Sequence, residues 1–321
     1  MSDDSHHAPP SSRDVPRFAG VPTFLRLPHR PDDAQDADVA IIGAPFDGGT
    51  TYRPGARFGP RAVRDASALA RGFSTAHGVD LFTELSCVDG GDVLCVPMDM
   101  ARTQDNLKAR VAELDAAATL PVVVGGDHSV SLGPLRALAE RHGPLGLVHF
   151  DAHSDTFGPA WDVELHHGTV FRAAMEEGLL RPRDVLQIGI RGPLTSGTDL
   201  NYAGDKGFRV VMIDELKEDL SAVVGHIEAL AECGAFYASF DMDFLDPAYA
   251  PGTGTPVPGG ATTYEAQRLL RALQRVELVG MDVVEISPDH DRSGNTALVA
   301  VTVLCELLSA VALQRRDARD D

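Results

Sequence analysis

The chain has 321 residues, 44% of them hydrophobic, which is enough for one large globular domain or two ordinary ones. Its 47 acidic side chains outnumber 28 Lys and Arg and give a formal net charge of -19. This balance argues against nucleic acid or an anionic membrane as a partner, and most of the charge is expected to form a solvated surface.

Residues 1–16 consist largely of Ser, Pro, Asp and His, which predicts a disordered tail, and residues 17–321 then form a single domain. The polar start does not resemble a signal peptide, and no apolar run reaches the roughly 18 residues of a membrane span. We therefore expect a cytoplasmic protein without a membrane partner. The four cysteines lack CxxC spacing and are predicted to be reduced thiols in the core: Cys87, Cys95, Cys233 and Cys305.

Short apolar runs rich in β-branched residues recur along the chain and predict strands within 37–47, 120–129, 143–155, 184–192, 208–216, 235–246 and 276–288. Helical patterns lie between them, within 59–73, 100–119, 131–143, 265–276 and 297–313, the first with Pro60 in its opening turn. Nearly all-apolar strands that alternate with helices predict an α/β domain whose mostly parallel sheet is covered on both faces.

Polar side chains gather where these predicted strands end, which is where ligands bind in such sheets. "VVVGGDHS" carries Asp127 and His128, "LVHFDAHSD" carries Asp151, His153 and Asp155, "YASFDMDF" carries Asp241 and Asp243, and "GMDVVEISP" carries Asp282 and Glu285. Alternate side chains of extended backbone point to one face, so the carboxylates within each motif can converge. Four segments are thereby predicted to aim at one point.

Carboxylates packed this closely repel one another unless cations neutralise them. The predicted ligand set contains two imidazoles and four carboxylates: His128, Asp151, His153, Asp155, Asp241 and Asp243. Oxygen-rich ligation without thiolate suits Mn²⁺ better than Zn²⁺ and leaves Ni²⁺, Co²⁺ and Fe²⁺ open. One such motif alone is more often a turn or a helix cap, but three of them at successive strand ends predict a site for two metal ions.

Three of these motifs, "GGDHS", "DAHSD" and "SFDMDFLDPAYAPGTGTPVPGG", resemble the signatures of the ureohydrolase family, which includes arginases, agmatinases, guanidinobutyrases and formiminoglutamases. The resemblance runs from about Arg17 to Leu313. It implies a three-layer α/β/α fold, two Mn²⁺ ions per subunit, and metal-dependent hydrolysis of a guanidino group to urea and an amine. It also implies a homo-oligomer, a trimer or a hexamer.

The resemblance further assigns the ligands. His128 and Asp155 match the family's ligands of one metal, His153 and Asp243 match those of the other, and Asp151 and Asp241 match the two bridging carboxylates. All six positions hold the expected residue type.

Catalytic roles follow from two more matches. "HHGTVFR" resembles the agmatinase-type "HGTxFR" segment and makes His167 the family's catalytic histidine, while "MDVVEISP" puts Glu285 where relatives hold the guanidinium. The implied reaction is attack by a hydroxide shared between the two metals. Asp155 would orient the nucleophile, Glu285 would anchor the substrate, and His167 would carry a proton to the leaving amine.

The loop "TFGPAWDVELHHGTVF" departs from the Asn-, Thr- and Ser-rich loop of arginases, so the resemblance favours agmatine, with 4-guanidinobutanoate or a similar guanidino acid second. A guanidino acid would need a cation at the pocket, for which Arg53, Arg57 and Arg191 are the candidates. Trp161 is a candidate specificity residue or a packing residue. A formiminoglutamase-like or other amidine hydrolase, and a weakly catalytic partner subunit of a hetero-oligomer, stay open as alternatives.

Overall fold

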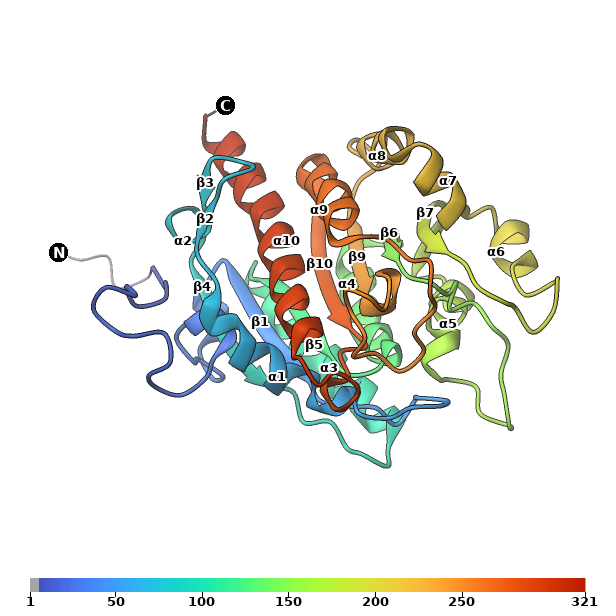
Figure 1. Cartoon of the computed structure of the whole chain (residues 1–321), viewed down its shortest axis with the longest axis horizontal. Coiled ribbons are helices and arrows are strands. Elements are labelled where there is room, and N and C mark those ends of the chain that lie inside the picture. Colours follow the sequence, from blue (N-terminus) through green and yellow to red (C-terminus); the bar gives the residue numbers. More distant parts are fainter. Residues whose placement is uncertain (1–5, 321) are drawn as a thin grey trace.

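A computed structural model describes residues 6–320 and shows a central sheet between two layers of helices (Figure 1). The sheet strands are β1 (Val39–Ala44), β4 (Cys87–Asp92), β5 (Leu120–Gly125), β6 (Leu145–Phe150), β7 (Leu180–Ile190), β8 (Arg209–Met212), β9 (Phe236–Asp241) and β10 (Leu278–Val284). They are ordered β4-β1-β5-β10-β9-β6-β7-β8, and every pair is parallel. A separate antiparallel pair joins β2 (Phe73–Ser74) and β3 (Val79–Asp80).

The helices are α1 (Gly59–Ala66), α2 (Leu81–Glu84), α3 (Met100–Ala116), α4 (Leu132–His142), α5 (Val170–Glu176), α6 (Asn201–Lys206), α7 (Ile213–Glu218), α8 (Leu220–Glu228), α9 (Thr263–Ala272) and α10 (Asn295–Asp320). Each of the five predicted helices is present, and Pro60 lies in the first turn of α1. The Thr262 hydroxyl and Glu265 form a capping box that starts α9.

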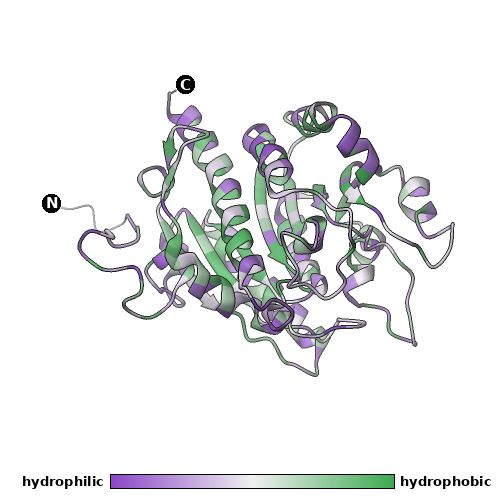
Figure 2. Ribbon diagram, viewed as in Figure 1, coloured by the Kyte–Doolittle hydropathy of each residue, from purple (hydrophilic) through white to green (hydrophobic). Residues whose placement is uncertain are grey.

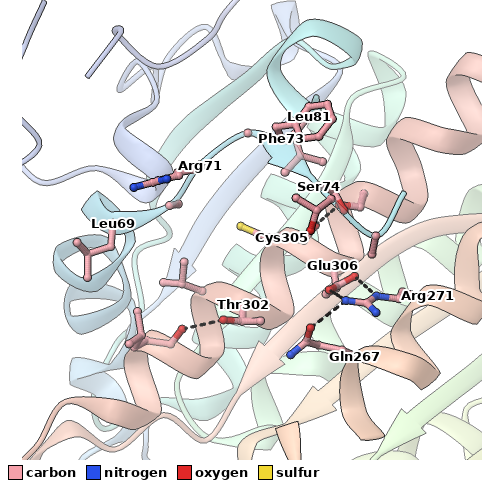
Figure 3. A pocket seen from close by; sticks show the side chains of 17 residues that line it. Leu69, Arg71, Phe73, Ser74, Leu81, Gln267, Arg271, Thr302, Cys305 and Glu306 are labelled. Atoms are coloured by element: carbon pink, nitrogen blue, oxygen red, sulfur yellow. Dashed lines mark hydrogen bonds and ion pairs between the residues drawn. The ribbon is translucent and has the colours of Figure 1, made fainter. Parts of the chain in front are cut away.

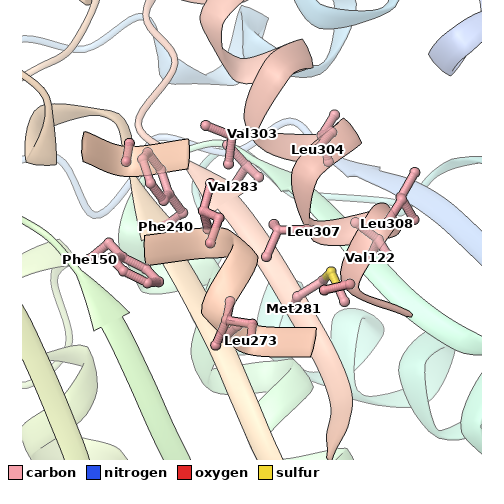
Figure 4. Packing of buried hydrophobic residues seen from close by; sticks show 14 of the residues in the cluster. Val122, Phe150, Phe240, Leu273, Met281, Val283, Val303, Leu304, Leu307 and Leu308 are labelled. Carbon is pink, nitrogen blue, oxygen red and sulfur yellow. The ribbon is translucent and has the colours of Figure 1, made fainter. Parts of the chain in front are cut away.

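Side-chain alternation along the strands divides the core into two clusters, one on each face of the sheet. Val39 and Ile41 of β1 belong to the cluster that includes α1, α8, α9 and α10, whereas Ala40 and Ile42 belong to the cluster that includes α3, α4 and α5. Figure 4 shows the first cluster, with leucines of α10 against Met281 and Val283 of β10. The predicted three-layer α/β/α fold is confirmed.

Helix α10 differs from the expectation that no segment could span a membrane. Asn295–Arg319 is long and apolar enough by length and composition, with a hydropathy of 2.2, and it is the only such helix in residues 6–320. However, 78% of that apolar window is buried inside the fold, as in the core helix of a globular domain. Figure 2 shows the hydrophobic and hydrophilic residues along this helix. Its apolar character is therefore explained by packing on the sheet.

The first described residues, around His7, run beside the edge strand β4. The backbone N–H of His7 donates to Ser86 Oγ, and the N–H of Cys87 donates to the His7 carbonyl at 2.9 Å. Residues 1–5 lie outside the described part of the chain, so the disordered tail over 1–16 stays a prediction. The four cysteines are all free, although Cys233 is exposed rather than part of the core.

Candidate active site

The candidate site lies at the carboxyl ends of four neighbouring strands, β5, β10, β9 and β6. His128 begins a short 3-10 turn just after β5, Asp151 follows β6, Asp241 ends β9, and Glu285 follows β10. Neighbouring parallel strands end at the same edge of the sheet, so this order brings the four motifs together. Because β9 and β10 are inserted between β6 and β5, motifs far apart in the sequence become neighbours.

The same local turn shapes the three aspartate motifs. In each, a carboxylate accepts the backbone N–H of the residue two positions later: Asp127 from Ser129 at 3.0 Å, Asp151 from His153 at 2.6 Å, and Asp241 from Asp243 at 2.8 Å. Asp favours this Asx turn because its short side chain reaches its own backbone. The turn uses one carboxylate oxygen and leaves the other for a second partner, which is the Gly49 N–H for Asp127 and His149 Nε2 for Asp151.

His128 forms the centre of the first half of the cluster. Its Nδ1 lies 3.2 Å from Asp151 Oδ2, 2.9 Å from Asp155 Oδ2 and 3.2 Å from Asp241 Oδ2. These groups are buried, and Nδ1 has no well-aligned hydrogen bond among the described residues. An orphaned imidazole nitrogen that faces three carboxylate oxygens is the arrangement that a bound cation would satisfy.

His153 forms the second half. Its Nδ1 lies 3.4 Å from Asp151 Oδ1 and 3.0 Å from Asp243 Oδ2. The two oxygens of Asp151 therefore face different imidazoles, one in each half, as a bridging carboxylate would. Both halves fit a divalent ion with nitrogen and oxygen ligands, and the structure brings all six predicted ligands into one cluster.

Crowding of the carboxylates shows in their pKa values. Burial raises the pKa of Asp241, and the charges of Asp243 and Asp151 raise it further, well above the usual range. Burial also raises the pKa of Asp151, but the neighbouring imidazoles of His149, His128 and His153 outweigh it and hold that pKa well below its usual value. The cluster thus needs positive charge to stay ionised at every oxygen.

Glu285 lies beside this cluster with one oxygen engaged and one free. Its Oε1 accepts the backbone N–H of His128 at 3.0 Å and lies 2.9 Å from His167 Nδ1, while Oε2 is buried without a partner among the described residues. Glu285 and Asp155 both adopt left-handed backbone, with φ of 61° and 49°. Such conformations are costly for residues other than glycine and concentrate at functional sites.

His167 bridges Glu285 and a loop that the sequence did not connect to the site. Its Nε2 lies 2.7 Å from the Thr51 hydroxyl, and its backbone N–H donates to the Gly49 carbonyl at 3.0 Å. Burial lowers the pKa of His167, but the hydrogen bond and charge of Glu285 outweigh burial and raise that pKa to about 9. The imidazole is therefore held as a proton donor near neutral pH.

A cavity of about 130 Å³ opens onto His153, Asp155, His167 and Asp241, while Glu285 and His128 lie behind its wall. Its lining comprises Thr51, His153, Asp155, Phe157, His166, His167, Gly168, Asp241 and Thr255, and includes no Lys or Arg. Trp161 does not line this cavity. It lies on the loop between Asp155 and His166 and is 77% exposed. A core-packing role for Trp161 within one chain is therefore wrong.

The three arginines considered as partners for a substrate carboxylate are all engaged elsewhere. Arg53 donates to the carbonyls of Thr253 and Gly254, and Arg57 pairs with the buried Asp47. Arg191 donates to backbone carbonyls that include Asp243 and Val257. Each guanidinium secures a loop around the site, so none of these three candidates is a free cation in this structure.

Several polar side chains behind the ligands were not identified from the sequence. His128 Nε2 lies 2.8 Å from Ser239 Oγ, which donates to the buried Asp282 at 2.7 Å. His149 Nε2 lies 2.8 Å from Asp151 Oδ2. Only the position of His149 within "HFDAHSD" could have signalled this contact, because a histidine in an apolar strand looks like any core histidine.

Comparison with known proteins gives a consistent result. The profile of the arginase family matches residues 37–309. Guanidinopropionase of Pseudomonas aeruginosa is 46% identical over 97% of this chain and 98% of its own length. The mitochondrial agmatinase of Gallus gallus is 41% identical over 94% of this chain and 89% of its own length.

The fold agrees with that of a solved relative. The structure of proclavaminate amidino hydrolase from Streptomyces clavuligerus superimposes with a TM-score of 0.89 at 44% identity, and the match covers 93% of this chain and 99% of that one. Together with the family profile, this similarity extends over the sheet and all four strand-end motifs. The chain belongs to the arginase family and is a metal-dependent guanidino hydrolase.

Proposed function

We propose that this protein hydrolyses the terminal guanidino group of a linear guanidine to urea and an amine. The observation that supports it best is the free Oε2 of Glu285, a buried carboxylate oxygen beside the His and Asp cluster. A planar guanidinium pairs strongly with such an oxygen, and it would come to lie next to the metal ligands and His167.

The metal ligands proposed are His128 and Asp155 for one ion, His153 and Asp243 for the other, with Asp151 and Asp241 shared. Two Mn²⁺ ions held there would supply a water of lowered pKa as the nucleophile. The mixed imidazole and carboxylate ligands around His128 and His153 suit such ions.

The chain's own groups have separable tasks in this reaction. Glu285 fixes the guanidinium and, through Oε1, also holds His167. His167 Nδ1–H faces Glu285. At the cavity wall, Nε2 lies 2.7 Å from the Thr51 hydroxyl and accepts the Thr51 backbone N–H at 3.3 Å, so Nε2 is the nitrogen that would take up a proton and pass it to the leaving amine. Asp155, held in left-handed backbone, orients the nucleophile. Proton donation to nitrogen matters because a deprotonated amine is a very poor leaving group.

We propose agmatine as the first substrate to test. The cavity lining has no Lys or Arg, and the loop between Asp155 and His166 carries Asp162 and Glu164. An ammonium tail suits this environment better than a carboxylate tail does. Guanidino acids form the second candidate class, because two of the similar proteins are named guanidinopropionase and guanidinobutyrase. A cytoplasmic homo-oligomer remains part of the proposal.

The test is urea release from a panel of agmatine, 4-guanidinobutanoate, 3-guanidinopropanoate and arginine, with apo-protein reconstituted separately with Mn²⁺ and Ni²⁺. We expect urea from one linear guanidine, with either an ammonium tail or a carboxylate tail, and little urea from arginine. A matched Glu285→Gln variant, which keeps the shape of the side chain, should release urea about 30- to 5,000-fold more slowly. Two bound metals without urea from any substrate would contradict the proposed reaction.

A further inference from the structure

His149 is a third imidazole at the cluster, and neither the sequence motifs nor the proposed reaction uses it. It lies on β6, fully buried, with Nε2 2.8 Å from Asp151 Oδ2. Its ring packs 4.3 Å from that of Phe171 and 5.1 Å from that of His128. By position alone, His149 is either a further metal ligand or a group that holds the shared carboxylate of Asp151.

Gln187 decides between these roles because it determines which nitrogen of His149 carries the proton. Gln187 lies directly opposite His149 on the neighbouring strand β7. Its Nε2 is 2.7 Å from the Ser154 carbonyl and 3.0 Å from His149 Nδ1. A carbonyl only accepts, so the amide atom beside Ser154 must be the NH₂ group.

The rest of the hydrogen-bond pattern follows from that assignment. The second N–H of Gln187 points at His149 Nδ1, so Nδ1 accepts and the ring proton is on Nε2. Nε2–H then donates to Asp151 Oδ2. A protonated nitrogen has no lone pair to give to a metal, which excludes His149 as a ligand while this bond is in place.

We propose that His149 and Gln187 are positioning residues of the metal centre, an inference that rests on the proposed role of Asp151 as the shared ligand. His149 fixes the plane of the Asp151 carboxylate, so that Oδ2 faces His128 and Oδ1 faces His153. Gln187 also holds the carbonyl of Ser154, the residue between the ligands His153 and Asp155. One amide therefore ties the shared carboxylate to the loop that supplies both halves of the site.

Two substitutions at Gln187 test the proposal without removing an imidazole. Gln187→Met keeps the length of the side chain but makes neither hydrogen bond. Gln187→Glu presents only acceptors, so it repels the Ser154 carbonyl and no longer makes His149 Nδ1 the acceptor nitrogen. Gln314→Met is the matched control, since Gln314 Nε2 also donates to two backbone carbonyls, those of Leu273 and Val276, but on α10.

The primary measurement is the Mn²⁺ dissociation constant of the apo-protein by chelator competition, with metal stoichiometry and the electron paramagnetic resonance spectrum of the loaded protein. Both Gln187 variants should bind Mn²⁺ about 10- to 100-fold more weakly, the usual effect of losing a partner behind a ligand. The electron paramagnetic resonance spectra of both variants should also show a weaker signal from a pair of magnetically coupled Mn²⁺ ions. Gln314→Met should change neither readout.

Other results would overturn the inference. Wild-type affinity in both Gln187 variants, with only thermal unfolding affected, would mean that these bonds serve packing alone. Complete metal loss in His149→Phe, combined with unchanged binding in Gln187→Met, would make His149 a ligand instead. If the wild-type protein binds two metals and releases urea while the Gln187 variants match it, this inference fails and the proposed function stands. If the wild-type protein binds no metal, both fail.

Discussion

Two hollows in the molecule contrast in how their polar groups are satisfied. The larger hollow, about 370 Å³, lies between the loop at residues 69–76 and helices α9 and α10 (Figure 3). There Arg271 makes two bonds to Glu306, at 2.7 and 3.0 Å, and a third to Gln267 at 2.9 Å. Burial and the charge of Glu306 raise the pKa of the Cys305 thiol to about 12, which makes it unreactive.

Beside the smaller cavity at the strand ends, several buried polar groups of the described residues lack partners. His128 Nδ1 and Glu285 Oε2 are buried and unpartnered among the described residues, and Asp155 and Glu285 hold left-handed backbone. A folded chain tolerates such groups only where something else compensates for them. The contrast indicates that buried unpartnered atoms and left-handed backbone point to a reactive site where they coincide with a cluster of predicted ligands, and that cavity volume alone does not.

Removing the carboxylate proposed to be shared by both metals should have the largest effect. Asp241→Ala should therefore lose metal binding, and urea release should fall by at least about 10³-fold. Metal analysis of the purified protein together with a urea assay measures both effects. Activity that persists with fewer than two metals would remove Asp241 from the shared position.

Glu285→Gln should have the next largest effect. Oε2 carries the charge that the substrate guanidinium needs, and an amide of the same shape offers none. Loss of one member of a buried charge pair costs about 2–5 kcal/mol, which corresponds to a fall of about 30- to 5,000-fold in kcat/KM. Metal content should stay at the wild-type level, and a variant that lost its metals instead would show that Glu285 supports the ligands rather than the substrate.

His167→Ala should keep both metals and lower kcat by about 10²- to 10⁴-fold, the range expected for a lost proton donor. Because contact with Glu285 raises the pKa of His167 to about 9, the donor is protonated below that pH and loses its proton above it. Wild-type kcat/KM should therefore decline above about pH 9. The variant should lack that decline, and an unchanged alkaline limb would assign it to another group.

Much of the fold was predictable because each segment carries its own signal. All seven strands and five helices inferred from apolar periodicity are present. The strand of the central sheet that was not predicted, β4, has the sequence "CVDGGD", whose glycines and aspartates interrupt the apolar pattern. Its buried Asp89 is compensated by Arg64 from α1, a pairing that depends on packing between distant segments.

The candidate ligands were predictable for the same reason, since each lies in a short motif at a strand end. What could not be predicted depends on which strands become neighbours. Thr51 reaches His167 across 116 residues, and Gln187 meets His149 only because β7 pairs with β6. The engagement of Arg53 and Arg191 by backbone carbonyls likewise required the loop at residues 251–260 to be in place.

The smallest effect on activity is expected in the larger hollow, where Arg271→Met removes its bonds to Glu306. This pair is partly buried, with 26% and 10% of the two side chains exposed, so its loss should lower the free energy of unfolding by about 1–2 kcal/mol. Because these groups are satisfied by one another and do not line the site cavity, kcat/KM should stay within about twofold, the scale of a surface substitution. Calorimetry and urea release on the same preparation separate the two quantities. A large fall in kcat/KM with both metals bound would mean that the larger hollow is coupled to catalysis, and the contrast between the two hollows would then be wrong.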